Sequence, residues 1–126
     1  MDPGLKRLPA RFYRSNSGRE PVREWLRKLD AEDRKILGED IKDVEFSWPI
    51  GMPLVRALGR ELWEVRSNLP RGRIARVLFC VEAECRVLLH GFIKKQQRTP
   101  PDELDLAKKR KKQYLETYEQ KNPSRK

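Results

Sequence analysis

The sequence has few of the residues on which metal sites and disulfide frameworks depend. It contains one histidine and two cysteines in 126 residues. Neither a CxxC nor an HExxH spacing occurs, so we expect no metal site and no cofactor. Two cysteines do not build a disulfide framework in a chain of this length, and we expect Cys80 and Cys85 to be free thiols in a reducing compartment.

Long apolar runs and glycine-rich phosphate loops are also missing. The longest apolar run, VLFCV, has five residues, whereas a membrane-spanning helix needs roughly 20. No P-loop, GxGxxG motif or signal-peptide pattern is found. We therefore expect a cytoplasmic protein with one domain over residues 1–119 and a flexible tail over residues 120–126.

Positive charge is abundant. The net charge is +10, and residues 94–126 hold 11 lysines and arginines against five carboxylates. Such a charge attracts phosphates, so nucleic acid is the first partner to consider. Simple solubility explains the charge equally well at this point.

The first part of the chain predicts one short strand and two helices. The segment ARFYRS has the composition of a strand. Ser17, Glu20 and Pro21 then fit the start of a helix, with Ser17 as the cap. A second helix is expected from Asp30 to about Phe46, because the Trp48-Pro49 pair ends it.

From Pro53 onward the apolar period changes from about 3.6 residues to two. The segments PLVRALG, ELWEVRS, RIARVLFCV and CRVLLHGFI predict four strands, joined by loops short enough to require antiparallel pairing. Pro100 and Pro101 then open a third helix. The pattern predicts an α+β fold, in which an antiparallel sheet has two N-terminal helices packed on one face and is followed by a C-terminal helix.

Alternation along the strands separates two faces of this sheet. In RIARVLFCV the odd positions are wholly apolar, so Arg76 points away from the helix-covered core. In the last strand the same reasoning assigns Val87, Leu89 and Ile93 to the core. Provided that no bulge disturbs the period, an open face then carries five polar side chains: Glu64, Arg66, Arg76, His90 and Lys94.

These side chains have a coherent chemistry for RNA. Arg66 and Arg76 can clamp a phosphate and stabilise the charge that builds on it. Either His90 or Glu64 can transfer a proton, and Lys94 can help to hold an RNA backbone. Without a metal, the natural route to RNA cleavage uses the ribose 2′-hydroxyl as the nucleophile and leaves a 2′,3′-cyclic phosphate.

Aromatic side chains near this face can stack on a base, and Phe92 and Trp48 are the candidates. Structural roles remain open for the same residues. A lone histidine on a strand is often structural, and arginines on a sheet face often form salt bridges with neighbours such as Glu64.

The segment LWEVRSNLPRGRIARVLFCVEAECRVLLHGFIKKQQRTPPDELDLAKKR resembles the phage-derived branch of the RelE/HigB toxin family. The resemblance covers nearly the whole chain, and the HGFIKKQQRTP segment is its most distinctive part. It implies a small RelE-like (microbial RNase-like) fold. It also implies a type II toxin that cleaves messenger RNA on the ribosome without a metal and thereby inhibits translation. The implied partners are the ribosome, messenger RNA and a cognate helix-turn-helix antitoxin.

The resemblance also assigns residues. Arg76 matches the arginine that stabilises the transition-state phosphate in RelE-type toxins, and Arg66 matches a basic position that contacts the messenger backbone. Lys94 and Lys95 fall where these toxins place further basic residues. Glu64 is a departure, because it stands where RelE has a lysine proposed for proton transfer. A stacking tyrosine has no clear equivalent either, so the general base stays open between His90 and Glu64.

The predicted site therefore has three groups of residues. The catalytic candidates are Arg66, Arg76, His90 and Lys94; the RNA-binding candidates are Arg73, Lys95 and Phe92; Glu64 is the further candidate for proton transfer. Two other functions share the fold, namely a ParE-like inhibitor of DNA gyrase and a noncatalytic RNA-binding module.

Overall fold

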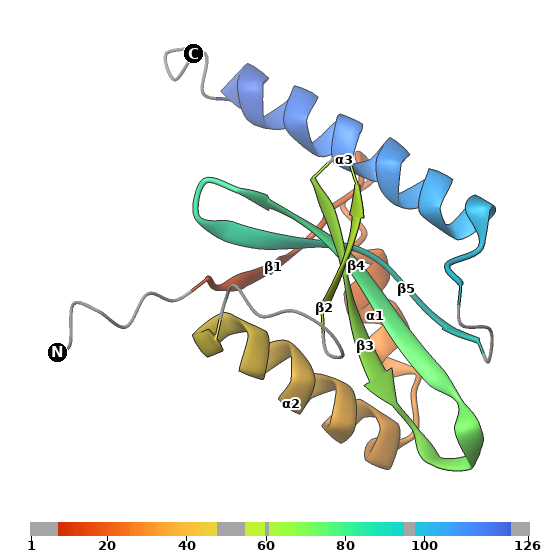
Figure 1. Ribbon diagram of the computed structural model, residues 1–126. Helices are drawn as coiled ribbons and strands as arrows, with labels where there is room; N and C mark the ends of the chain where they lie inside the picture. Colours follow the sequence, from red (N-terminus) through yellow and green to blue (C-terminus); the bar gives the residue numbers. More distant parts are fainter. Residues whose placement is uncertain (1–7, 48–54, 60, 95–97, 122–126) are drawn as a thin grey trace, which may run out of the picture.

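The computed structural model describes residues 8–47, 55–59, 61–94 and 98–121. The described chain forms a five-stranded sheet with helices on both sides (Figure 1). The predicted α+β fold class is confirmed. In chain order the elements are β1 (Ala10–Phe12), α1 (Pro21–Arg27), α2 (Ala31–Ser47), β2 (Val55–Gly59), β3 (Leu62–Asn68), a short 3-10 turn (Pro70–Gly72), β4 (Ile74–Glu82), β5 (Cys85–Lys94) and α3 (Pro101–Lys121).

The strands lie in the order β1-β5-β4-β3-β2. The four strands from β2 to β5 are antiparallel to their neighbours, as their short loops predict. The predicted N-terminal strand is also present, but it pairs with β5 in parallel, with Ala10 opposite Arg86. The parallel pairing is possible because the whole chain from α1 to β4 separates the two strands.

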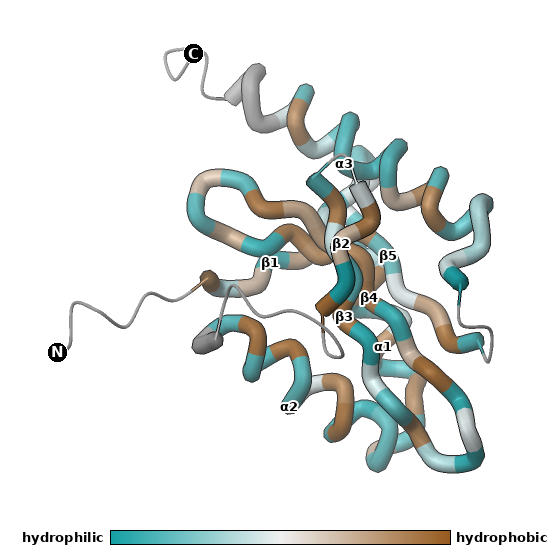
Figure 2. Tube along the Cα trace, viewed as in Figure 1, coloured by the Kyte–Doolittle hydropathy of each residue, from teal (hydrophilic) through white to brown (hydrophobic). Residues whose placement is uncertain are grey.

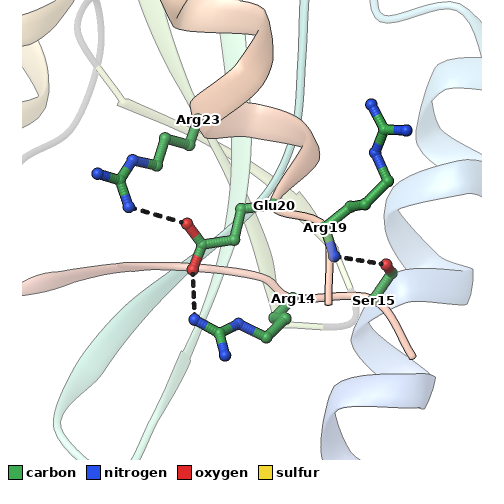
Figure 3. A network of polar contacts seen from close by, with 5 residues as sticks. All are labelled: Arg14, Ser15, Arg19, Glu20 and Arg23. Atoms are coloured by element: carbon green, nitrogen blue, oxygen red, sulfur yellow. Dashed lines mark hydrogen bonds and ion pairs between the residues drawn. The ribbon is translucent and has the colours of Figure 1, made fainter. Parts of the chain in front are cut away.

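Helix α1 begins at Pro21, whose fixed φ suits the first turn. The predicted cap by Ser17 is wrong, because the N-cap is Glu20 and it makes no side-chain capping bond. The Glu20 carboxylate instead joins Arg14 and Arg23, at 3.3 and 3.2 Å (Figure 3). These two arginines hold the pKa of Glu20 below its usual value, with Arg23 as the larger cause.

Two apolar cores lie on opposite faces of the sheet. The first lies between the sheet and helices α1 and α2, where Val22 and Leu37 meet Val77 and Phe79. The second lies under α3. The expectation of an open second face is therefore wrong, since α3 runs across it (Figure 1). Its buried members are Tyr13, Leu62, Leu78, Cys80, Val87, Leu89, Phe92 and Ala107.

A β-bulge in β5 explains part of this difference. Leu78 is opposite His90, but the next residue of β4, Phe79, is opposite Leu88, so Leu89 is extra. Beyond such an extra residue, each side chain points to the face opposite to the one that simple alternation predicts. The assignment of Val87 and Leu89 to the first core is thus wrong, because both lie in the second, while Ile93 packs against the first as predicted.

Helix α3 packs against the sheet through polar contacts as well as apolar ones. Figure 2 shows that α3 is mainly hydrophilic, with isolated apolar residues. The Arg110 guanidinium donates to the carbonyl oxygen of Leu89 at 2.9 Å and lies 5.7 Å from the centre of the Tyr13 ring. The Tyr13 hydroxyl donates to Gln113. The bulge carbonyl thus finds a partner in α3, as a buried backbone group requires.

Candidate functional site

The strand register brings the predicted basic and acidic residues together under the start of α3. Arg66 on β3 is directly opposite Arg76 on β4, and Arg76 is opposite Phe92 on β5. In the adjacent row, Glu64 and His90 are both opposite Leu78. Alternation therefore predicted a shared face correctly for these residues, because they all lie on the same side of the bulge.

Arg76 is the most unusual side chain of this face. It is completely buried, and none of its three guanidinium nitrogens has a hydrogen-bond partner in the described part of the chain. The centre of the Phe92 ring lies 5.9 Å from its guanidinium carbon. Burial lowers the pKa of Arg76, while the charge of Glu64 acts in the opposite direction. Burying a cation without hydrogen bonds is costly, and an anion that binds here would reduce that cost.

Arg66 differs from Arg76 in lying close enough to Glu64 to form an ion pair. Its Nε lies 3.8 Å from Oε1 of Glu64, which is a long ion pair. Glu64 is itself fully buried, and its other oxygen accepts a hydrogen bond of 2.6 Å from the Thr99 hydroxyl. In the structural alternative, arginines of this face form salt bridges with Glu64. This holds for Arg66 but not for Arg76.

Two contributors to the site were not predicted. Arg56 on β2 is directly opposite Glu64, and its charge also lowers the pKa of Arg76. Extending the strand alternation to the segment VRALG would have found it. Thr99 precedes α3 and reaches Glu64 from far along the chain, so no local pattern could have indicated it.

His90 is fixed from two sides by α3. Its Nε2 lies 2.5 Å from Oε1 of Glu103, and its Nδ1 lies 3.4 Å from Nη1 of Arg110. An arginine only donates hydrogen bonds, so Nδ1 is the acceptor and we assign the ring proton to Nε2, facing Glu103. In this tautomer the lone pair of Nδ1 faces Arg110, so the use of Nδ1 as a base requires this contact to open.

Lys94 joins the same carboxylate. Its Nζ lies 3.2 Å from Oε2 of Glu103, and its side chain is 39% exposed. Glu103 thus binds two cationic or proton-donating groups of β5 at once. Two further candidates, Lys95 and Trp48, lie outside the described residues.

Arg73 is placed away from the other candidates. Its guanidinium forms a two-pronged ion pair with Asp33 on α2, at 2.9 and 3.1 Å, and donates to the carbonyl oxygen of Pro70. Asp33 is almost completely buried. This pair ties the turn between β3 and β4 to α2, and an RNA contact by Arg73 stays a prediction.

Two further observations concern the described residues alone. They contain no cluster of three histidine, cysteine or acidic side chains in an arrangement that suits a metal ion. None of the helices in these segments is both long and apolar enough to cross a membrane.

The fold and this face define a class of protein: a small α+β domain that buries an arginine, which has no hydrogen-bond partner among the described residues, beside a second arginine, a carboxylate and a histidine. Residues 24–112 match the family described as phage-derived protein Gp49-like (DUF891), and the chain belongs to this family. The family is part of the RelE/HigB-like group of toxin–antitoxin proteins, which implies an antitoxin partner. A search of curated proteins found no match.

Proposed function

We propose that the protein is the toxin of a type II toxin–antitoxin pair of the HigB-like branch and that it cleaves messenger RNA on the ribosome, which inhibits translation. Membership of a toxin-like family supports the general role. The observation that carries the reaction is Arg76, a buried guanidinium with no hydrogen-bond partner among the described residues, beside Arg66 on the neighbouring strand. A phosphate would supply the hydrogen-bonding anion that Arg76 lacks among the described residues.

The proposed reaction needs no group other than the RNA itself as nucleophile. The ribose 2′-oxygen attacks the adjacent phosphorus, the bond to the 5′-oxygen breaks, and the products are a 2′,3′-cyclic phosphate and a 5′-hydroxyl. Negative charge builds on the phosphate oxygens in the transition state. Arg76 and Arg66 stabilise that charge, which is typically the largest catalytic contribution in such a site.

Proton transfer is assigned to the remaining groups of the face. The 2′-hydroxyl loses a proton, and Glu64 is the preferred acceptor because its Oε1 has no hydrogen-bond partner within the described segments. The leaving 5′-oxygen gains a proton, for which His90 and Lys94 are the candidates. Phe92 is buried beneath these groups at 6% exposure, so it supports Arg76 and His90 rather than offering a free ring to a base.

The proposed dependence on the ribosome follows from how the site is held. Thr99 binds Glu64, and Glu103 binds both His90 and Lys94, so the acid–base groups are engaged in the protein alone. A ribosome that presents a fixed messenger RNA strand supplies the orientation of the 2′-hydroxyl that free RNA lacks. The proposed partners are accordingly the ribosome, messenger RNA and a cognate helix-turn-helix antitoxin.

Primer extension on cellular messenger RNA tests this function. After brief expression, the wild type is expected to produce discrete cuts within translated regions, and Arg76→Ala is expected to produce none. Arg14→Ala is the control, because it removes the same charge from an exposed surface position. Intact messenger RNA together with gyrase-linked DNA breaks contradicts the proposal and favours the ParE-like alternative.

A further inference from the structure

The Glu103 carboxylate occupies a position that suits a phosphate. Its two oxygens are divided between two donors of β5, with Oε1 at 2.5 Å from His90 Nε2 and Oε2 at 3.2 Å from Lys94 Nζ. A phosphodiester group also has two free oxygens with negative charge, so the same donors can hold it. Glu103 lies in the first turn of α3, whereas both donors belong to the sheet.

Arg76, which has no hydrogen-bond partner in the described part of the chain, belongs to the row of the sheet next to both donors. His90 and Lys94 are each two residues from Phe92 along β5, and Phe92 is directly opposite Arg76. The row that contains Arg76 and Phe92 therefore lies between the positions of His90 and Lys94 on the same face of the sheet. The two donors that flank this row share the Glu103 carboxylate, whereas the Arg76 guanidinium within the row has no hydrogen-bond partner among the described residues.

The segment that supplies Glu103 also closes the site elsewhere. Thr99, four residues before Glu103, donates to the buried Glu64. Residues 99–103 therefore engage Glu64, His90 and Lys94 together. Movement of this one short segment frees three groups of the candidate site.

We propose that His90 and Lys94 form a second phosphate-binding position, and that the Glu103 carboxylate is its internal occupant, which RNA displaces. The position takes a phosphate next to the one bound by Arg76. The inference rests on the proposed function for the identity of the anion as an RNA phosphate. Glu103 then opposes RNA binding in the free protein, while Arg76 favours it.

A noncleavable oligonucleotide tests the inference without any need for catalysis. The probe is a single-stranded 2′-O-methyl RNA, whose affinity is measured by fluorescence anisotropy for the full chain, for Glu103→Gln and for Asp102→Asn. Both variants remove one negative charge from the same helical turn. Asp102 is exposed, and no ion pair to it is found in the described part of the chain.

Glu103→Gln is expected to bind the oligonucleotide about threefold or more tightly than Asp102→Asn, since it removes a competing ion pair as well as a charge. Equal affinities of the two variants overturn the inference. That result leaves the proposed function standing, because Arg76-dependent cuts in messenger RNA are measured independently. Conversely, a wild type that produces no cuts in messenger RNA contradicts the proposed function. It does not change the expected order of affinities of the two variants for the oligonucleotide.

NMR spectroscopy of the wild-type chain provides a second test, which stays valid if Glu103→Gln perturbs folding. His90 is the only histidine in the sequence, so its imidazole nitrogen signals are unambiguous in an NMR spectrum. Addition of the oligonucleotide to the wild type is expected to shift the Nε2 signal as Glu103 is replaced by phosphate. An unchanged Nε2 signal, at concentrations at which anisotropy shows binding, overturns the inference.

Discussion

Arg76 makes no hydrogen bond among the described residues that would offset the cost of its burial. It is completely buried, it has no hydrogen-bond partner within the described residues, and burial lowers its pKa. A side chain of similar length without a charge would fit the same space at lower cost. Retaining a guanidinium there is understandable if its partner is a ligand.

Replacement of Arg76 by methionine is therefore expected to separate activity from stability. Removal of the unpaired charge should raise the free energy of unfolding by about 1 kcal/mol or more. Loss of the charge that stabilises the transition state should reduce messenger RNA cleavage by about 100-fold or more. Urea denaturation and a ribosome-dependent cleavage assay measure the two effects.

Arg73→Met is the matched control. It breaks the pair with Asp33 and leaves a buried carboxylate without its partner, so the urea midpoint should fall. Opposite shifts of the two midpoints support the assignment of Arg76 to a ligand. A similar loss of stability in both variants would mean that Arg76 is structural.

The two cysteines are expected to differ in reactivity. Burial raises the pKa of the Cys80 thiol to about 12, whereas Cys85 is half-buried near a strand end. At pH 8 an alkylating reagent should label one thiol of the folded protein and two after denaturation, as counted by mass spectrometry. Because folding raises the pKa of Cys80, its stabilising contribution is complete below the unfolded value near 9 and is lost as the pH rises toward 12. Labelling of both thiols at equal rates would contradict this placement.

At the level of single elements, strand β5 shows where sequence reasoning succeeds and where it fails. Alternation placed His90, Phe92 and Lys94 on one face, and the register agrees. It failed for Val87 and Leu89, because the extra residue at the bulge reverses the faces on the other side. No residue in RVLLHGF signals that bulge; it is stabilised by Arg110, which is about 20 residues further along the chain.

The contact between α1 and β5 gives a stability prediction. A Cβ atom at Gly91 would collide with the Trp25 ring, so Gly91→Ala is expected to lower the free energy of unfolding by about 1–3 kcal/mol. Gly38 lies inside α2 with free space around it, and Gly38→Ala should raise the free energy of unfolding by about 0.5–1 kcal/mol. Chemical denaturation measures the free energy of unfolding of both variants and of the wild type. A stability of Gly91→Ala equal to that of the wild type would show that Trp25 does not lie against this strand.

At the scale of the whole molecule, the element order and the α+β class could be predicted because each element has its own period and its own start or stop signal. The position of α3 could not. Its sequence is rich in lysine and carries few apolar residues, so its sheet-facing side has little local signature. The covering of the site by residues 99–103 depends on this packing, and it could not be inferred from the strands alone.

The layered arrangement also relates the charge of the molecule to its proposed activity. Glu64, Arg66, Arg76, His90 and Lys94 come from three strands, yet the sheet holds them in two adjacent rows and one further position. The lysines of α3 lie beside this face, where Lys108, Lys111 and Lys112 line a cavity of about 250 Å³ with Leu62 and Leu115. The proposed phosphate binding at the sheet and the proposed attraction of RNA by the lysines of α3 would thus involve the same side of the molecule.

The central claim is that this face cleaves messenger RNA through the 2′-hydroxyl. The most direct test combines the purified protein with ribosomes carrying a messenger RNA in which the nucleotide before a mapped cut has a 2′-deoxyribose. We predict that this single substitution abolishes the cut at that position, while the unmodified messenger yields a fragment ending in a 2′,3′-cyclic phosphate. A cut that persists at the deoxynucleotide would contradict the claim.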